Sequence, residues 1–477
     1  MTKRSLLALV LIAGTLQAEI TLPKLIGSGM VLQRESEVPI WGLADPGEDI
    51  SITCSWIKKT ISIKANADGE WTVNLTTGQA GGPHSITLVA SHTVTLEDVL
   101  FGEVWLGSGQ SNMEMPVAPV SNAYTGVNDW EAELAAANHP QIRFFQVGNI
   151  ASKEPQKDVQ PGVFVYGVNV PPSKWQSCQS STVKHFSSTA YFFARKLHRE
   201  LGVPVGVIDA SWGGSAIEPW IGKKQLAQAG FEAMAKRGDD QPDQPRAMGV
   251  PTRLYNGMIA PLMPFRLKGV IWYQGESNHG RPKTYKRLMQ ALVAGWRHGF
   301  KSDFSFYYVQ IAPFKYKQNA AYLREQQLQA LSIRKSGMVV TADIGNLKDI
   351  HPKNKQEVGR RLALKALAND YGRKITYAGP RYQKMKRNGG SVTLYFDHVG
   401  MGLVAYGGGA LKDFEIAGVD RKFVKATAVI EGSQVVVESP SVKRPVAVRY
   451  AFSSQSRGSL MNKDGLPASP FRTDDWE

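Results

Sequence analysis

The chain has only two cysteines among its 477 residues, Cys54 and Cys178. Two thiols allow one disulfide at most, and these two fall in regions of different sequence pattern, so we expect two buried free thiols. No group of cysteines and histidines has the spacing of a metal site. The sequence therefore predicts neither a structural metal nor a cofactor.

Long apolar runs are missing beyond the N-terminus, and none approaches the roughly 18 apolar residues that a membrane-spanning helix needs. Residues 1–18 have the pattern of a secretory signal peptide, with Lys3 and Arg4 at the charged start, an apolar segment over 5–16, and Ala18 as the cleavage residue. We expect an exported protein, periplasmic or secreted, without a membrane span.

Acidic side chains are also scarce, because 41 Asp and Glu stand against 56 Lys and Arg, for a formal net charge of +15. The basic residues are scattered along the chain, and no nucleic-acid-binding module is present. The positive charge is therefore consistent with a solvated surface on an exported protein or with an acidic polysaccharide as the partner. We expect no nucleic-acid partner.

Three sequence patterns follow the N-terminal segment, which suits the two or three domains expected for this length. Residues 19–100 are short alternating runs separated by turn residues, which is typical of a β-sandwich. Residues 373–477 return to this alternation and predict a second β-rich region. That region is either a separate domain or one that packs with the first.

Residues 101–372 alternate apolar strands with helices, which predicts an α/β domain with a doubly wound, mostly parallel sheet. We expect helices at 130–138, 189–201, 285–300, 320–334 and 354–371, and strands at 142–147, 205–210, 270–273, 304–311 and 338–342. In such sheets the functional site lies beyond the carboxyl ends of the strands. Four polar segments follow strands of this domain.

The first segment is Glu-Val-Trp-Leu-Gly-Ser-Gly-Gln-Ser-Asn-Met-Glu at 103–114. An apolar strand breaks at Gly107 and Gly109, and Ser111 then stands at the start of a helix, beside N–H groups able to hold an oxyanion. A Gly- and Ser-rich turn is more often a tight connection than a catalytic elbow. The functional interpretation therefore depends on the other segments.

The second segment places Gly213 and Gly214 after the strand at 205–210, where their N–H groups are open to a ligand, although a plain turn explains them equally well. The third carries Gln274, Glu276 and Asn278 at the end of the strand at 270–273. Asn278 or Gln274 is a candidate oxyanion donor, and Glu276 is a candidate to orient another polar group.

The fourth segment, residues 343–354, contains His351 with Asp349 two positions before it. A carboxylate on one ring nitrogen fixes the tautomer of a catalytic histidine. With Ser111 and the oxyanion donors, this pair completes the set needed for acyl transfer through a covalent serine ester.

Three of these motifs resemble the sialate O-acetylesterase family, a branch of the SGNH hydrolases: Gly-Ser-Gly-Gln-Ser-Asn-Met at 107–113, Trp-Tyr-Gln-Gly-Glu-Ser-Asn at 272–278 and Asp-Ile-His-Pro-Lys-Asn-Lys at 349–355. Shorter likenesses at 30–33, 67–71, 254–258 and 465–474 extend the resemblance over almost the whole mature chain. We therefore expect an SGNH-type α/β domain, flanked by β-sandwich, jelly-roll-like regions at both ends, and a carbohydrate O-acetylesterase activity.

The resemblance implies that Ser111 is the nucleophile and that His351 is the general base and acid. It also implies Gly213 or Gly214 and Asn278, together with the Ser111 N–H, as oxyanion donors.

The acidic partner of His351 is less determined. Many SGNH enzymes have two residues between the aspartate and the histidine, whereas one residue separates Asp349 from His351. Asp349 is the first choice, with Glu276 and Asp343 as alternatives. The candidates for supporting roles around the site are Gln110, Asn112, Gln274 and Glu276.

Other functions remain open at this point. The substrate is an acetylated sialic acid or an acetylated polysaccharide such as xylan or xyloglucan. A sugar-binding protein that has lost catalysis on the same fold is the alternative from another class, and the intact Ser111, His351 and Asp349 argue against it. A lipase or thioesterase needs a broad apolar pocket, and the sequence contains no obvious apolar lid.

Overall fold

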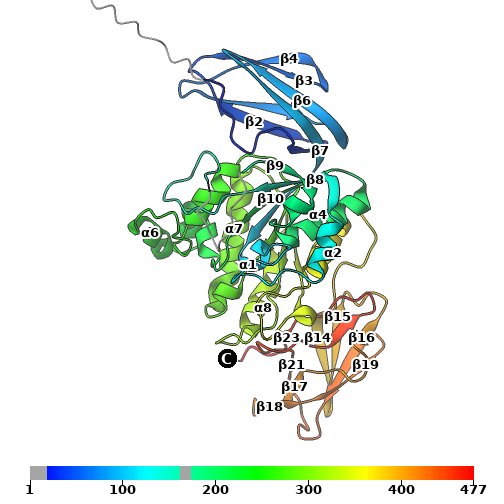
Figure 1. The fold of residues 1–477 in the computed structure, drawn as a ribbon. Helices are drawn as coiled ribbons and strands as arrows, with labels where there is room; N and C mark the ends of the chain where they lie inside the picture. Colours follow the sequence, from blue (N-terminus) through cyan, green and yellow to red (C-terminus); the bar gives the residue numbers. More distant parts are fainter. Residues whose placement is uncertain (1–18, 162–172, 477) are drawn as a thin grey trace, which may run out of the picture.

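The computed structural model describes residues 19–161 and 173–476. Figure 1 shows an α/β domain in the middle, with a β-rich region at each end. The two β-rich regions therefore lie apart and do not form one sandwich. The predicted signal peptide, residues 1–18, lies outside the described residues. Among the described residues, no helix has the length and apolar character to cross a membrane.

The α/β domain is built on a sheet whose strands follow the order β13-β12-β11-β7-β10-β8-β9. All neighbours are parallel except β9, which runs antiparallel to β8. The strands are β7 (Thr93–Gly109), β8 (Asn138–Gln146), β9 (Trp175–Gln179), β10 (Val205–Ser211), β11 (Gly269–Tyr273), β12 (Ser305–Val309) and β13 (Ser336–Val339). The predicted α/β class is confirmed, with a mixed sheet.

Helices cover both faces of this sheet, which explains why its central strands are continuous apolar runs. Alternate residues of β11 enter two different cores. Ile271 faces a core that contains Leu197 and Leu362, whereas Val270 faces a core that contains Leu292. The first core thus includes α4 (Ser188–Leu201) and α9 (Lys355–Asn369), and the second includes α7 (Tyr285–Gly299).

The remaining helices are shorter: α1 (Ser111–Glu114), α2 (Trp130–Ala135), α3 (Ser180–Val183), α5 (Lys223–Gln228), α6 (Glu232–Asp240) and α8 (Ala321–Gln329). The helix expected at 130–138 is shorter because β8 already begins at Asn138. The helix expected at 320–334 gives way after Gln329 to a 3-10 turn at Ala330–Ser332.

Strand β7 joins the N-terminal β-rich region to the α/β domain. Its first part pairs with β1 (Val31–Gln33) and β6 (Gly81–Val89), and β3 (Asp49–Cys54) and β4 (Ile57–Lys64) continue that sheet. A separate pair, β2 (Glu37–Leu43) with β5 (Glu70–Thr76), completes the region. The expected domain boundary at residue 100 therefore falls inside a continuous strand.

The C-terminal region has a hydrophobic core of its own. Its strands form three antiparallel groups, β14-β15-β20-β19, β16-β22 and β18-β17-β21-β23. They are β14 (Arg381–Asn388), β15 (Ser391–Asp397), β16 (Leu403–Ala405), β17 (Phe414–Ala417), β18 (Phe423–Lys425), β19 (Thr427–Glu431), β20 (Gln434–Glu438), β21 (Ala447–Tyr450), β22 (Leu460–Asn462) and β23 (Phe471–Arg472).

Both cysteines are buried free thiols, as expected. Cys54 lies in β3 and Cys178 in β9, so they belong to different parts of the molecule. Burial raises the pKa of the Cys54 thiol to about 11 and that of Cys178 to about 12. Since the thiolate is the reactive form, both thiols are chemically inert at neutral pH.

The last residue of β7 is a point of very close backbone approach. Gly109 has φ +141°, and a Cβ atom there would lie 2.1 Å from the carbonyl oxygen of Tyr273 on β11. A side chain would separate the two strand ends. We expect Gly109→Ala to lower the free energy of unfolding by about 2–4 kcal/mol.

Gly107→Ala is the matched control, because the nearest atoms to a Cβ at this position of the same strand are 3.4 Å away. It should change the free energy of unfolding by no more than about 1 kcal/mol. Urea unfolding of the two variants beside the wild type tests this expectation, and equal destabilisation would contradict it.

Candidate active site

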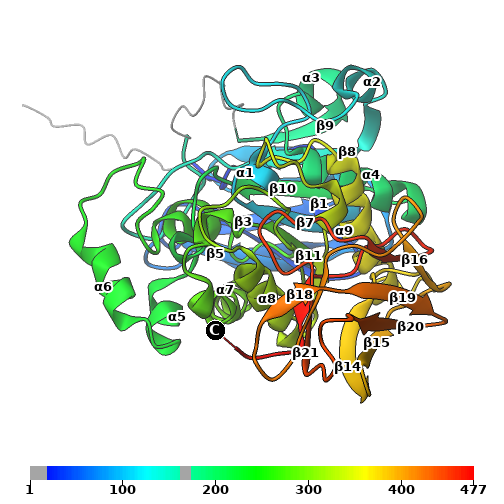
Figure 2. The same cartoon turned by 90° about the horizontal axis from the view of Figure 1, so that it is seen from below.

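The four polar segments meet at one edge of the central sheet. Ser111 begins α1 directly beyond β7, the paired glycines follow β10, and residues 274–278 follow β11. In the sheet, β7 lies between β10 and β11 and pairs with both. Figure 2 shows α1 beside the ends of β7 and β10. The parallel order of the strands therefore brings together segments that are far apart in the sequence.

Ser111 is half-buried and lies against Gly213. A Cβ atom on Gly213 would be 3.4 Å from the Ser111 Cβ and only 2.6 Å from the Glu114 carboxylate, so a side chain there would displace this carboxylate. The Gly213 N–H donates to Glu114 Oε2 at 2.9 Å. The same carboxylate accepts from Tyr124 Oη at 2.6 Å and from Asn149 Nδ2 at 2.8 Å. Burial raises the pKa of Glu114, and these three donors oppose that rise.

Asp349 contacts the imidazole of His351. Its Oδ1 lies 3.3 Å from His351 Nδ1 and also accepts the His351 backbone N–H at 2.9 Å. Its Oδ2 accepts from Thr125 Oγ1 at 3.3 Å. The Tyr124 ring packs edge-on against the imidazole, with centroids 5.2 Å apart. The single residue between Asp349 and His351 thus allows the aspartate carboxylate to contact the imidazole.

The two alternative carboxylates contact other residues, although Glu276 Oε2 is buried and has no hydrogen-bond partner among the described residues. Asp343 forms a two-pronged ion pair with Arg361, at 2.8 and 2.6 Å. Glu276 Oε1 accepts from Asn112 Nδ2 at 2.6 Å. Of these three acids, only Asp349 forms an ion-pair contact with His351 among the described residues.

Burial lowers the pKa of His351 to about 4. The nearby Lys355 ammonium adds to this effect, and Asp349 opposes it. The imidazole is therefore neutral at neutral pH, which is the form that can accept a proton from a hydroxyl group.

The side chain of Asn112 connects the serine segment to the histidine segment. Its Nδ2 donates to the carbonyl of Ile350 at 3.1 Å and to Glu276 at 2.6 Å. Its Oδ1 accepts from Lys355 Nζ at 2.5 Å. The residue after Ser111 thus holds the peptide just before His351, although nearly 240 positions separate them in the chain.

Lys355 is a site residue that sequence reasoning missed. Its side chain is fully buried, and its ammonium lies 5.3 Å from the centroid of the Tyr273 ring. Burial lowers the pKa of this lysine to about 7, while Glu276 opposes the shift. A lysine in the first turn of a helix normally indicates an exposed position. The one sequence feature that could have identified Lys355 as a site residue is its position at the end of the 349–355 motif.

The predicted supporting amides form a buried network between the ends of β7 and β11. Gln110 Oε1 accepts from the N–H groups of Gly275 and Ser277, at 3.3 and 3.2 Å, and from Gln274 Nε2 at 3.1 Å. Gln274 Nε2 also donates to Asn278 Oδ1 at 2.7 Å. These bonds hold the two strand ends together.

Asn278 lies deep in this network and is 1% exposed. Its Oδ1 also accepts the Ile217 N–H at 3.0 Å, and its Nδ2 donates to Glu218 at 3.1 Å. Gly214, in contrast, is exposed, and its carbonyl accepts from Ser277 Oγ at 2.9 Å.

In residues 19–161 and 173–476, no three His, Cys, Asp or Glu side chains are grouped as metal ligands.

The sequence profile of a family described as carbohydrate esterase, sialic acid-specific acetylesterase, matches residues 102–368. The chain belongs to this family. As a member, it is a carboxylic-ester hydrolase. The match covers the α/β domain up to the last turn of α9, and so includes all four polar segments.

Relatives that match about three quarters of the chain or more agree with the esterase family. The chain is 31% identical to human sialate O-acetylesterase over 401 residues, which cover 76% of this chain and 73% of the human protein. It is 31% identical to the mouse sialate O-acetylesterase over 437 residues, 78% of each chain. The crystal structure of a carbohydrate acetylesterase from Xanthomonas citri matches 96% of this chain and 100% of its own, with 38% identity and a TM-score of 0.85.

The pKa of His351 provides a test of the site's electrostatics. Replacing Lys355 by Met removes a positive charge that disfavours the imidazolium, so the pKa of His351 should rise from about 4 toward its usual 6.5. NMR titration of the imidazole measures this change. Lys353→Met, which removes an exposed charge close by in the sequence, is the control and should leave the pKa nearly unchanged. A Lys355 variant with no rise would show that burial alone sets the low value.

Proposed function

We propose that this protein removes O-acetyl groups from carbohydrates by a serine-histidine-acid mechanism with an acetyl-enzyme intermediate. The observation that carries the proposal is the bond from Asn112 to the Ile350 carbonyl, which brings the segment of Ser111 to that of His351. Membership of the carbohydrate esterase family supports the reaction class. An SGNH-type arrangement of the sheet is part of the same proposal.

In the proposed reaction, the neutral His351 takes the proton of the Ser111 hydroxyl as Oγ attacks the acetyl carbon. The imidazolium then gives this proton to the sugar oxygen as the ester bond breaks, leaving acetyl-Ser111. Water, deprotonated by the same imidazole, attacks the acetyl group, and acetate leaves as the proton returns to Ser111. Asp349 orients the imidazole and stabilises its charged form.

The candidate oxyanion donors differ in whether their N–H groups already donate a hydrogen bond. The Ser111 N–H begins α1, where no earlier turn of the helix supplies an acceptor. The Gly214 N–H belongs to an exposed residue beside the site. The Gly213 N–H already donates to Glu114, and Asn278 already donates to Glu218. We therefore propose the N–H groups of Ser111 and Gly214 as the main oxyanion donors. Gly213 and Asn278 would have to share their N–H groups between the oxyanion and their present acceptors, Glu114 and Glu218.

The acetylated sugar is proposed from the relatives. The human and mouse proteins are named for sialate esters, whereas the Xanthomonas citri protein is described only as a carbohydrate acetylesterase. An acetylated sialic acid is our first substrate, and acetylated xylan or xyloglucan is the alternative. The proposed place of action is outside the cytoplasm, periplasmic or secreted, because of the signal-like residues 1–18.

The first variant to test is Ser111→Ala. Acetate release from an activated acetyl ester, and from acetylated sialosides, xylan and xyloglucan, should fall below about a thousandth of the wild-type rate. Ser108→Ala is the matched control in the same motif, because its hydroxyl donates to the Ala210 carbonyl inside the sheet at 2.6 Å. It should lose about 1 kcal/mol of stability and keep its activity.

A Ser111 variant that retains more than a thousandth of the rate would remove this serine from the nucleophile role. A wild-type protein that releases no acetate but binds one of these sugars would instead be the non-catalytic binding protein.

The second test separates Asp349 from Asp343. Asp349→Asn should lower kcat by about 100-fold or more, because an amide no longer favours the required imidazole tautomer or its charge. Asp343→Asn should lower the unfolding temperature instead, since it weakens the ion pair of the 3% exposed Arg361, and the folded enzyme should keep kcat. Rate measurements and thermal unfolding of both variants distinguish the two effects. The reverse pattern would make Asp343 the orienting acid.

A further inference from the structure

A cavity lies away from the proposed active site, where the C-terminal region packs on the α/β domain. It has a volume of about 240 Å³ and is lined by β13, by the middle of α9, and by segments 377–381 and 466–469. Strand β13 is the last strand of the sheet, so one of its edges has no neighbouring strand. The C-terminal region covers this edge and leaves the cavity between them.

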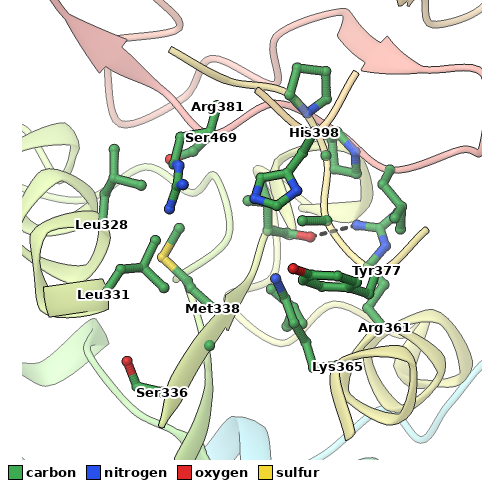
Figure 3. Close-up of a pocket in the computed structure, with 18 of the residues that line it drawn as sticks. Leu328, Leu331, Ser336, Met338, Arg361, Lys365, Tyr377, Arg381, His398 and Ser469 are labelled. Atoms are coloured by element: carbon green, nitrogen blue, oxygen red, sulfur yellow. Dashed lines mark hydrogen bonds between the residues drawn. The ribbon is translucent and has the colours of Figure 1, made fainter. Parts of the chain in front are cut away.

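The walls of the cavity differ in character, as Figure 3 shows. Leu328, Leu331 and Met338 form an apolar wall. Lys365 and His398 lie on the other side, and Arg381 lies beside Ser469, between Leu328 and His398. The cavity therefore has an apolar part and a cationic part.

Lys365 is buried without an acceptor. It is 6% exposed and makes no hydrogen bond or close ion pair with any residue that the structure describes. Its ammonium lies 4.7 Å from the centroid of the Tyr377 ring. Burial lowers the pKa of this lysine to about 7, and the neighbouring Arg381 adds to the effect. A buried ammonium with no counter-charge in contact is unfavourable, so it favours an anion beside it.

The other charges around the cavity are already paired. Arg361 is bound to Asp343 and also donates to the Val340 carbonyl, the bond drawn in Figure 3. Arg381 is bound to Asp397, whose carboxylate also accepts from Gln383.

The remaining groups leave the positive charge of Lys365 uncompensated. Asp397 is 3.9 Å from His398 Nε2, and its charge opposes the lowering of the Lys365 pKa. Its hydrogen bonds, however, go to Arg381 and Gln383, not to Lys365. With both nearby carboxylates bound to arginines, Lys365 has no acceptor among the described residues, and the His398 ring has only the 3.9 Å contact with Asp397.

We propose that this cavity binds a small organic carboxylate, with the carboxylate against Lys365 and an apolar body against Leu328, Leu331 and Met338. The volume of about 240 Å³ admits a molecule of the size of benzoate. The site is separate from the proposed active site, because Lys355 begins α9 and Lys365 lies ten residues further on, a rise of about 15 Å along the helix. The proposal is independent of the esterase activity.

Thermal unfolding of the full chain tests the proposal, with benzoate as the probe. Saturating benzoate should raise the unfolding temperature by about 2 °C, because it binds only the folded protein. Benzamide, which has the same shape and no charge, should not. Inorganic phosphate, which has the charge and no apolar body, should act more weakly than benzoate.

Lys365→Met removes the charge and keeps an apolar side chain of similar length. This variant should fold, be at least as stable as the wild type, and lose the benzoate response. Lys386→Met, which changes an exposed lysine of β14, is the control and should respond like the wild type. The proposal fails if benzoate stabilises the Lys365 variant as much as the wild type, if benzamide matches benzoate, or if phosphate matches it. The comparison of benzoate with benzamide on the wild type stands even if the Lys365 variant does not fold.

Discussion

The hydrogen bonds of the Asn112 side chain are the interaction on which the site depends. A carboxamide is one of the few side chains that accepts and donates at once. Asn112 does both, because it accepts from Lys355 and donates to Glu276 and to the Ile350 carbonyl. Lys355 and Glu276 are buried and Ile350 is half-buried, and an unpaired polar group in such a place is costly. One side chain thus fixes the loop of His351 relative to the start of α1, where Ser111 stands.

The sheet makes this arrangement possible. Strand β7 runs through the N-terminal region and the α/β domain, and it ends against β11 at Gly109, where the backbones are too close for any side chain. The amide network of Gln110 and Gln274 then joins the first turns beyond both strands. Polar residues on rigid strand ends hold their positions better than residues on free loops.

Much of the α/β domain followed from sequence periodicity, because long amphipathic helices and buried strands have distinct patterns. The helix expected at 285–300 is α7, which ends at Gly299. Polar side chains directly after apolar strands also identified the segments that meet at the site. What the sequence could not show was pairing across distant segments. The antiparallel position of β9 and the burial of Lys355 both depend on tertiary contacts, and a lysine in a first helical turn normally remains in water.

Helix α9 carries two buried lysines, and their environments explain why they differ. Lys355 has an acceptor in Asn112 and a nearby carboxylate in Glu276, as well as the Tyr273 ring. Lys365 has only an aromatic ring in contact. A desolvated cation–π contact contributes about 2 kcal/mol, which is less than the cost of several kcal/mol for removing an ammonium from water. The first lysine is therefore satisfied by the fold itself. The second requires either loss of its proton or an anion from solution, and the cavity beside it gives that anion a place to bind.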